Sequence, residues 1–269
     1  METGIFFIAN DTMYDLAVAF LNSVRIFEPL LPLCFIPYDN SCARIKELAR
    51  KYNFTVFSDT ALLHACDEIS SRFHGATLGQ YRKLAMWEGP FSHFAYLDTD
   101  TVLLSHMQVP LQLLDEWDIV TAASDMQNIR KFVWKDTVTT CDQKIDSEYA
   151  ANTGFIFSKA GSLSMKAIEN RISDAITLSP HMELDYAEQA LLNFLIVTSG
   201  CRYSSLSKVR RKTGRRHIPL VVWSGHCDDD LLKRRGPTLA IHWAGQWRQG
   251  EYLRSRVWRF FRDFQVDAR

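Results

Sequence analysis

Two acidic residues in the segment FAYLDTDTVLL, Asp98 and Asp100, are the clearest candidates for chemistry in this sequence. They follow an apolar run, and residues at i and i+2 of a strand point to the same face, so their carboxylates can converge. A carboxylate buried without a partner is costly. A cation such as Mg²⁺ or Mn²⁺ would neutralise both and bridge them to a substrate phosphate. The pair therefore indicates a cation site, although two solvated carboxylates in a loop also fit so short a motif.

The segments before this pair alternate between short apolar strands and amphipathic helices. We expect strands at 4–9, 33–37, 54–57 and from 94 onward, and helices at 13–27, 41–52, 59–73 and 78–87. This alternation predicts a parallel sheet with helices on both faces. Ligands bind such sheets at the carboxyl ends of the strands, which is where the acidic pair lies.

The second half of the chain is less regular. We expect strands at 118–122, 153–157, 218–222 and 238–243, and helices at 163–175, 184–197 and 252–264. Neither a repeat nor a low-complexity linker interrupts the sequence. We therefore predict a single α/β domain over residues 1–269, with two halves that join near Ser105.

Composition excludes several classes of protein. Lys plus Arg and Asp plus Glu number 31 each among 269 residues, which does not indicate nucleic-acid binding. The N-terminus lacks a signal-peptide pattern, and no apolar run reaches the ~20 residues that span a bilayer. The six cysteines form no CxxC pair and indicate reduced thiols. We expect a cytoplasmic protein without a nucleic-acid partner.

Two kinds of enzyme combine an apolar strand with such an acidic pair. In a phosphatase of the haloacid-dehalogenase type, Asp98 would be a covalent nucleophile and Asp100 a general acid and base. That motif normally opens the first core strand, whereas residues 1–93 precede the strand here. In a metal-dependent glycosyltransferase, the pair instead holds the cation that binds the diphosphate of a sugar nucleotide.

Five segments together resemble glycosyltransferase family 8, the family of glycogenin and bacterial lipopolysaccharide galactosyltransferases. They occur in the family's order and span nearly the whole chain. In sequence they are Tyr81-Arg82-Lys83-Leu84, Tyr96-Leu97-Asp98-Thr99-Asp100, Ala151-Asn152-Thr153-Gly154-Phe155, Glu188-Gln189 with the helix to Asn193, and His242-Trp243-Ala244-Gly245. The resemblance implies a GT-A fold, in which helices flank a Rossmann-like mixed sheet.

The resemblance also implies a retaining transferase that moves a sugar from a nucleotide-diphosphate sugar, with a UDP-sugar expected first. Residues 1–105 would bind this donor and residues 106–269 the acceptor. Asp98, Asp100 and His242 would hold the cation. Imidazole suits Mn²⁺ better than Mg²⁺, so Mn²⁺ is the first expectation and Mg²⁺ the second. The cation would act as a Lewis acid on the departing diphosphate.

Further donor-site residues follow from the same resemblance. They are Ala9, Asn10, Asp11, Tyr14, Arg82, Lys83, Thr99, Gly245 and Arg248. Asp11 would accept from the base or the ribose, or cap a helix, and Tyr14 would stack. Arg82 and Lys83 are adjacent on a helix and diverge, so we expect one of them to reach the diphosphate. Arg248 stands where the family commonly has a lysine, and its guanidinium can bind phosphate through two hydrogen bonds.

The resemblance places Gln189, Glu188 and Asn152 around the reacting sugar carbon. Glu188 departs from the family, which has an aspartate at that position. The extra methylene moves the carboxylate by about 1 Å, a displacement that can cost orders of magnitude in rate. A catalytically inert nucleotide-sugar-binding protein therefore stays open beside the phosphatase.

Three other segments bear on the acceptor. KVRRKTGRRH (208–217) fits a solvated loop, a lid over the diphosphate or a patch for an anionic acceptor. The basic, aromatic helix at 252–264 either packs on the body or makes peripheral contact with an anionic membrane. Residues 128–149 are the candidate acceptor loop. The sequence does not distinguish a saccharide, lipid, peptide or small metabolite as the acceptor. It does not indicate the oligomeric state either.

Overall fold

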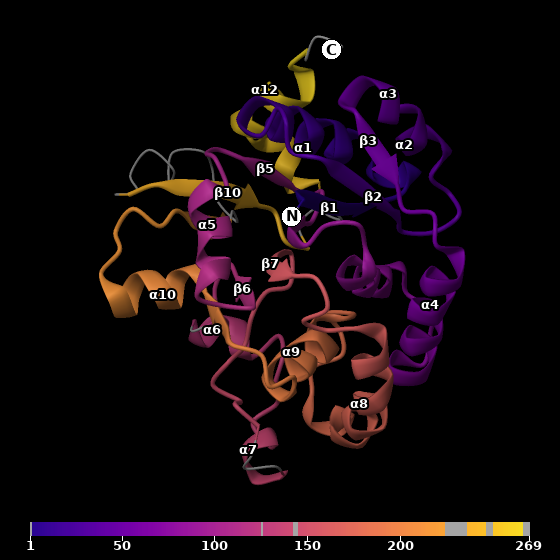
Figure 1. Ribbon diagram of the computed structural model, residues 1–269, viewed down its shortest axis with the longest axis vertical. Helices are drawn as coiled ribbons and strands as arrows, with labels where there is room; N and C mark the ends of the chain where they lie inside the picture. The colour runs from indigo at the N-terminus through magenta and orange to yellow at the C-terminus, as the bar shows by residue number, and fades with distance from the viewer. Residues whose placement is uncertain (1, 125, 142–144, 224–235, 246–249, 266–269) are drawn as a thin grey trace.

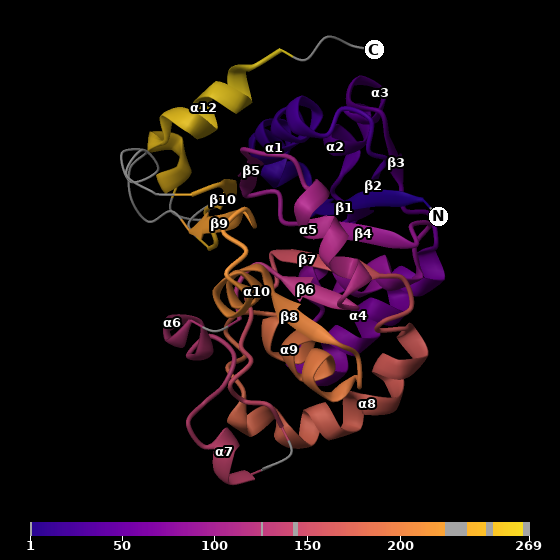
Figure 2. The same cartoon turned by 60° about the vertical axis from the view of Figure 1, so that its left-hand side comes forward.

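The structure, a computed structural model, describes residues 2–124, 126–141, 145–223, 236–245 and 250–265. A mixed sheet of seven strands lies between two layers of helices (Figures 1 and 2). Its β7 runs antiparallel to both neighbours, and the other neighbouring pairs are parallel. The strands are, in order across the sheet, β3 (Phe54–Val56), β2 (Leu33–Pro37), β1 (Thr3–Ala9), β4 (His93–Leu97), β7 (Phe155–Lys159), β6 (Ile119–Thr121) and β8 (Tyr203–Ser205).

A second sheet has three strands in the order β5 (Thr101–Leu103), β10 (Thr238–His242) and β9 (Leu220–Trp223). The composition of the segment FAYLDTDTVLL suggests one continuous strand, but the segment forms two strands. It is β4 of the large sheet followed by β5 of the small one. The expectation was wrong because residues 98–100 carry the chain from one sheet to the other, where β5 pairs with β10.

Helices cover both faces of the large sheet. One layer contains α1 (Tyr14–Phe27), α2 (Ala43–Glu47), α3 (Ala49–Tyr52), α5 (Gln108–Gln112) and α10 (Leu206–Thr213). The other contains α4 (Thr60–His74), the 3₁₀ helix η2 (Gly79–Glu88), α6 (Gln127–Arg130), α7 (Val138–Cys141), α8 (Met165–Leu178) and α9 (Gln189–Thr198). Short 3₁₀ turns lie at Asp11–Met13, Leu113–Asp115, Ser179–His181 and Glu251–Arg254, and α12 (Arg256–Asp263) comes last.

The alternation of side chains along β1 explains the two layers. Phe6 and Ile8 belong to the core on the α4 side, whereas Ile5, Phe7 and Ala9 belong to the core on the α1 side. Successive residues of a strand point to opposite faces, and here both faces are apolar and buried. This is the pattern of a sheet covered on both sides, so the predicted α/β fold is confirmed.

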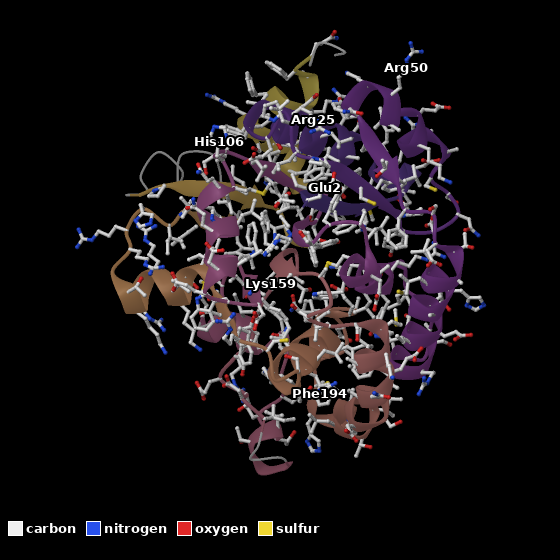
Figure 3. The ribbon with its side chains drawn as sticks, in the orientation of Figure 1. Glu2, Arg25, Arg50, His106, Lys159 and Phe194 are labelled. Atoms are coloured by element: carbon white, nitrogen blue, oxygen red, sulfur yellow. The ribbon has the colours of Figure 1, made fainter. Side chains whose placement is uncertain are left out.

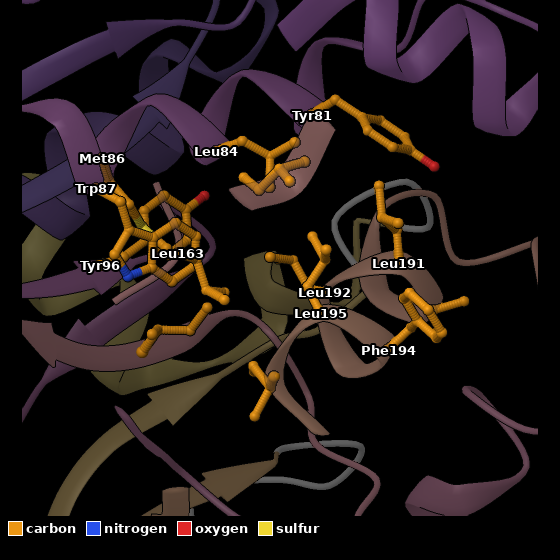
Figure 4. Close-up of a cluster of buried hydrophobic side chains, with 14 of the residues drawn as sticks. Tyr81, Leu84, Met86, Trp87, Tyr96, Leu163, Leu191, Leu192, Phe194 and Leu195 are labelled. Atoms are coloured by element: carbon orange, nitrogen blue, oxygen red, sulfur yellow. The ribbon is translucent and has the colours of Figure 1, made fainter. Parts of the chain in front are cut away.

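The helix expected at 78–87 is a 3₁₀ helix. Tyr81, Leu84 and Trp87 recur every third residue and are fully buried against α8 and α9, as Figure 4 shows for part of this core. A spacing of three matches the 3.0 residues per turn of a 3₁₀ helix. This geometry also separates Arg82 from Lys83 by about a third of a turn.

Both basic segments are helical. The segment 208–217, considered above as a loop, instead contains most of α10, because Ser205 caps the helix through Lys208 N–H and Gly214 ends it with a positive φ. The final helix α12 packs against α1 through Trp258 and Phe261. Membrane contact by this helix remains a prediction. Among the described helices, none is both long and apolar enough to cross a bilayer.

Two side chains of α1 fasten it to its neighbours. Arg25, labelled in Figure 3, donates to the carbonyls of Tyr52 and Asn53 at the end of α3, at 2.8 and 2.9 Å. Asn22 is fully buried, and its amide donates to the carbonyls of Phe261 and Phe264 at the end of α12. Polar side chains thus connect α1 to α3, which follows it closely in sequence, and to α12, which comes much later.

Candidate active site

A cavity of about 890 Å³ lies beyond the carboxyl end of β4. Its lining combines carboxylates, amides and a histidine with apolar side chains, and residues from all five family-like segments reach it. The polar residues that line it include Lys83, Asp98, Thr99, Asp100, Asn152, Thr153, Glu188, Gln189 and His242. The site thus lies at the strand ends where α/β sheets bind ligands.

Asp98, Asp100 and His242 form the group best suited to a metal ion. One ligand atom from each lies within 4.8 Å of the others. His242 Nε2 is 3.1 Å from Asp100 Oδ1 and 3.8 Å from Asp98 Oδ2. Asp98 follows β4, and His242 ends β10 opposite the first residue of β5, so the two sheets together create the group.

The polar atoms of this group fit a cation. Within the described part of the chain, the buried atoms Asp100 Oδ1, His242 Nδ1 and His242 Nε2 make no well-aligned hydrogen bond, although Asp100 Oδ1 and His242 Nε2 lie 3.1 Å apart. Buried polar atoms normally make a hydrogen bond. Two carboxylates and an imidazole are a donor set for a divalent cation, and binding to it would satisfy the carboxylate oxygen and one ring nitrogen.

Neighbouring charges determine the protonation of this group. Burial lowers the pKa of His242, but attraction to Asp100 and Asp98 outweighs burial and raises the pKa above its ordinary value. Burial raises the pKa of Asp98, but Lys83, His242 and a hydrogen bond from Tyr96 hold it below the usual range. Asp98 is therefore ionised, as a metal ligand must be, whereas His242 would release its ring proton when a cation binds.

Gly154 has no side chain, which makes room for His242 and Asp98 to approach each other. A Cβ on this residue would overlap His242 Cε1 and lie 2.7 Å from Asp98 Oδ2. Its carbonyl also accepts a hydrogen bond from Asp98 N–H at 2.9 Å. Gly154 was part of a family-like segment but not among the predicted site residues. The close approach that requires glycine comes from β10, and local sequence contains no sign of it.

Lys83 connects the metal-binding group to the sugar-side residues. Its Nζ lies 2.6 Å from Glu188 Oε1 and 3.4 Å from Asp98 Oδ1. Thr153 Oγ1 donates to the same Glu188 oxygen at 2.8 Å, and Tyr96 O–H donates to Asp98 Oδ1 at 2.6 Å. Burial lowers the pKa of Lys83, but the two carboxylates outweigh burial and raise it. The lysine is therefore charged.

Gln189 and Asn152 are held by hydrogen bonds at the start of α9. Gln189 Oε1 accepts from Asn152 Nδ2 at 3.3 Å, and Gln189 Nε2 donates to the carbonyl of Phe132 at 3.0 Å. Ala187, two residues before Gln189, has a φ of 53°. For a residue other than glycine this conformation costs about 1 kcal/mol, and such strain is concentrated at functional sites.

The four residues predicted to bind the base and ribose of the nucleotide do not line the cavity. Ala9, Asn10, Asp11 and Tyr14 are not among the described residues that line the cavity, although the neighbouring Ile8, Met13 and Tyr38 are. Asn10 donates to Asp39, Asp11 accepts from Ile45 N–H, and the Tyr14 ring contacts the Arg44 guanidinium at 4.1 Å. These four residues lie from the last residue of β1 to the first residue of α1, beside the cavity.

The other donor-site residues divide into three sets. Thr99 and Gly245 line the cavity, as Lys83 does. Arg82 instead pairs with Asp67 through two contacts, at 2.7 and 2.9 Å, and donates to the Pro37 carbonyl. The lysine is thus the member of the Arg82–Lys83 pair that faces the cavity. Arg248 lies outside the described residues.

Comparison with known proteins identifies the fold. No protein-family model matches the sequence, and neither does any curated protein. Solved structures are similar to 90–91% of this chain: the bifunctional glycosyltransferase WbbM without ligand (TM-score 0.61, 14% identity, 46% of that chain covered), mouse xyloside xylosyltransferase 1 without ligand (0.62, 13%, 99%), and galactosyltransferase LgtC with donor and acceptor sugar analogues (0.56, 17%, 87%). The expected GT-A fold is confirmed.

Proposed function

We propose that this chain is a metal-dependent glycosyltransferase that moves a sugar from a nucleotide-diphosphate sugar, a UDP-sugar first, to an acceptor. One observation carries the proposal. Buried atoms of Asp100 and His242 that make no well-aligned hydrogen bond lie beside Asp98, in a cavity that Glu188 and Gln189 also line, within a glycosyltransferase fold. This fold favours the transferase over the phosphatase.

Asp98, Asp100 and His242 are the residues that would hold the cation. Mn²⁺ is the first expectation because one donor is an imidazole nitrogen. When bound, the cation would stabilise the negative charge that develops on the departing diphosphate. Lys83 would add a fixed positive charge nearby, since Asp98 and Glu188 orient its ammonium.

We assign the sugar side of the cavity to Gln189, Asn152 and Glu188. The first two are held in one orientation by mutual and backbone hydrogen bonds, which favours a positioning role toward the donor sugar. Glu188 is longer than the family's aspartate, and its carboxylate reaches Lys83 and Thr153. The extra methylene therefore serves an ion pair, which supports an adapted sugar pocket rather than a damaged one.

The acceptor end is assigned to the side of the cavity formed by the segment around α6. Phe132 and Tyr186 line it, and their ring centroids lie 4.7 Å apart in an edge-to-face pair. Such aromatic faces suit the apolar side of a sugar ring. The site would thus hold the donor near Asp98 and the acceptor near Phe132, with Gln189 between them, because Gln189 bonds to the Phe132 carbonyl.

Isothermal titration of UDP with and without Mn²⁺ tests the proposal. We expect binding that depends on Mn²⁺, and a loss of more than about 10-fold in Asp100→Asn, because a metal ligand matters at least as much as its supporting residues. Asp174→Asn, an exposed carboxylate of α8, is the matched control. Absence of UDP binding in both conditions would refute the proposal. UDP binding without hydrolysis or transfer across an acceptor panel would identify the inert alternative.

A further inference from the structure

A second, basic hollow adjoins the cavity. It has a volume of about 710 Å³, and its wall includes Ser207, Arg210, Arg211, Arg216, Leu220 and Gly236. We call it the basic pocket. Ser207 and Leu220 also line the main cavity, so the two spaces share a wall. A molecule that lies across Ser207 and Leu220 would therefore contact both spaces.

The charge of the basic pocket comes from α10 and the turn after it. The segment 208–217 contains six lysines and arginines and no acidic residue. Leu206 and Val209 bury the apolar side of α10 in the core, which leaves its cationic positions at the surface. Arg215 pairs with Glu116 at 2.6 Å. Arg211 and Arg216 are exposed and line the pocket.

Arg210 is built into the wall rather than free in solvent. Its Nη1 donates to the Ile218 carbonyl at 3.1 Å. Its Nη2 lies so close to Gly236 that a Cβ there would be 2.6 Å away. The guanidinium is thus held in place before any ligand arrives, and a planar, oriented guanidinium binds phosphate oxygens through paired hydrogen bonds.

We propose that the basic pocket binds a phosphate group of the acceptor, so that the substrate class of this enzyme is a phosphate-bearing acceptor. This inference rests on the proposed function. The acceptor hydroxyl would enter the main cavity, and its phosphate would lie over the wall at Arg211 and Arg216. A neutral acceptor would leave this cluster of cations without a role in binding.

Titration of a hexose 6-phosphate and of the same hexose without phosphate tests the proposal in the full chain. One series of titrations is run with saturating UDP and Mn²⁺, so that the nucleotide site is filled, and a second series is run without UDP. We expect the phosphorylated hexose to bind at least about 10-fold more tightly, and Arg211→Gln/Arg216→Gln to lose about 10-fold or more, since hydrogen bonds to charged groups exceed 1.4 kcal/mol. Arg72→Gln/Lys166→Gln removes the same charge from exposed positions on α4 and α8, away from α10 in Figure 1, and should change nothing.

Three results would overturn the proposal: no preference for the phosphorylated hexose, equal binding by the arginine double variant, or loss of hexose phosphate binding when UDP is added. Failure of UDP to bind would count against the proposed function alone, because the hexose titrations can be read without it. Vesicles of phosphatidylglycerol and of phosphatidylcholine distinguish the source of the phosphate. Sedimentation with the anionic vesicles that Arg211→Gln/Arg216→Gln abolishes would support a lipid-linked acceptor.

Discussion

Lys83 Nζ lies 2.6 Å from Glu188 Oε1, and both side chains are almost completely excluded from solvent. A buried ion pair of this kind contributes little net stability when intact, because desolvation offsets the attraction. It becomes costly when one partner is removed, since the other charge is left unpaired. The pair therefore predicts an asymmetric response to substitution.

Lys83→Met should lower the free energy of unfolding by about 3–5 kcal/mol, because it leaves the buried Glu188 carboxylate and the partly exposed Asp98 carboxylate without their cation. Urea denaturation measures this loss. Lys83→Met/Glu188→Gln should recover part of it, because the second change removes one of the orphaned charges. Lys46→Met, at an exposed position of α2, should stay within about 0.5 kcal/mol of wild type. A double variant no more stable than Lys83→Met would contradict this account of the pair.

Gly154→Ala should abolish Mn²⁺-dependent UDP binding while the protein remains folded. The added methyl group would overlap His242 Cε1 and approach Asp98 Oδ2 to 2.7 Å, so the two ligands cannot keep their positions. Titration of UDP and far-ultraviolet circular dichroism measure the two effects. Gly200→Ala is the control, since its φ is 78° but no atom lies within 4 Å of the new Cβ. It should cost about 1 kcal/mol in stability and leave UDP binding intact, whereas normal UDP binding by Gly154→Ala would refute the prediction.

Asp118 should stabilise the protein in a pH-dependent way. Hydrogen bonds from Arg202 and from Lys159, which Figure 3 labels, hold the pKa of this carboxyl well below its usual range. A folded pKa below the unfolded value gives stability that is complete above the unfolded pKa, about 3.9, and is lost as pH falls through the folded pKa. Asp118→Asn should therefore be less stable than wild type near neutral pH, and the difference should shrink below about pH 4. Urea denaturation from neutral pH to below about pH 4 measures this difference in stability, with Asp174→Asn as control. A difference between Asp118→Asn and wild type that does not change with pH would contradict the prediction.

Asn22→Ala should loosen α12. The substitution leaves the carbonyls of Phe261 and Phe264 without their donor and Tyr52 O–H without its acceptor. Loss of such buried partners costs about 1–3 kcal/mol. The substitution should therefore accelerate hydrogen exchange in α12 and leave hydrogen exchange in α8 unchanged. Asn170→Ala, on the exposed side of α8, should have no such effect, and unchanged exchange in α12 would show that its packing does not depend on Asn22.

Much of the fold could be predicted because it depends on local patterns. The short apolar runs that became β1, β2 and β4 and the capped, amphipathic α1 and α4 all carry their signals within a few residues. The end of β4 before Asp98 had no such local signal, because β5 is defined by its pairing with β10, which lies much later in the chain. The three-residue β8 was missed since so short a strand has no detectable period.

In the candidate site, too, some features could be predicted from local motifs and others depend on distant parts of the chain. Asp98, Asp100 and His242 were predicted together from motifs and meet in the structure. Whether Arg82 or Lys83 faces the cavity could not be predicted, because Asp67 on α4 holds the arginine. The ion pair of Lys83 with Glu188 joins two segments that only the folded chain brings together.

The position of His242 at the end of β10 has a consequence for the order in which the protein is made. The first half of the chain, which contains Asp98 and Asp100, leaves the ribosome long before β10 exists, and non-local pairings such as β5 with β10 form late and slowly. The nascent chain would therefore bring His242 to Asp98 and Asp100 only after β10 has been synthesised. Under the proposed function, the cation site that binds the sugar nucleotide would be incomplete until then.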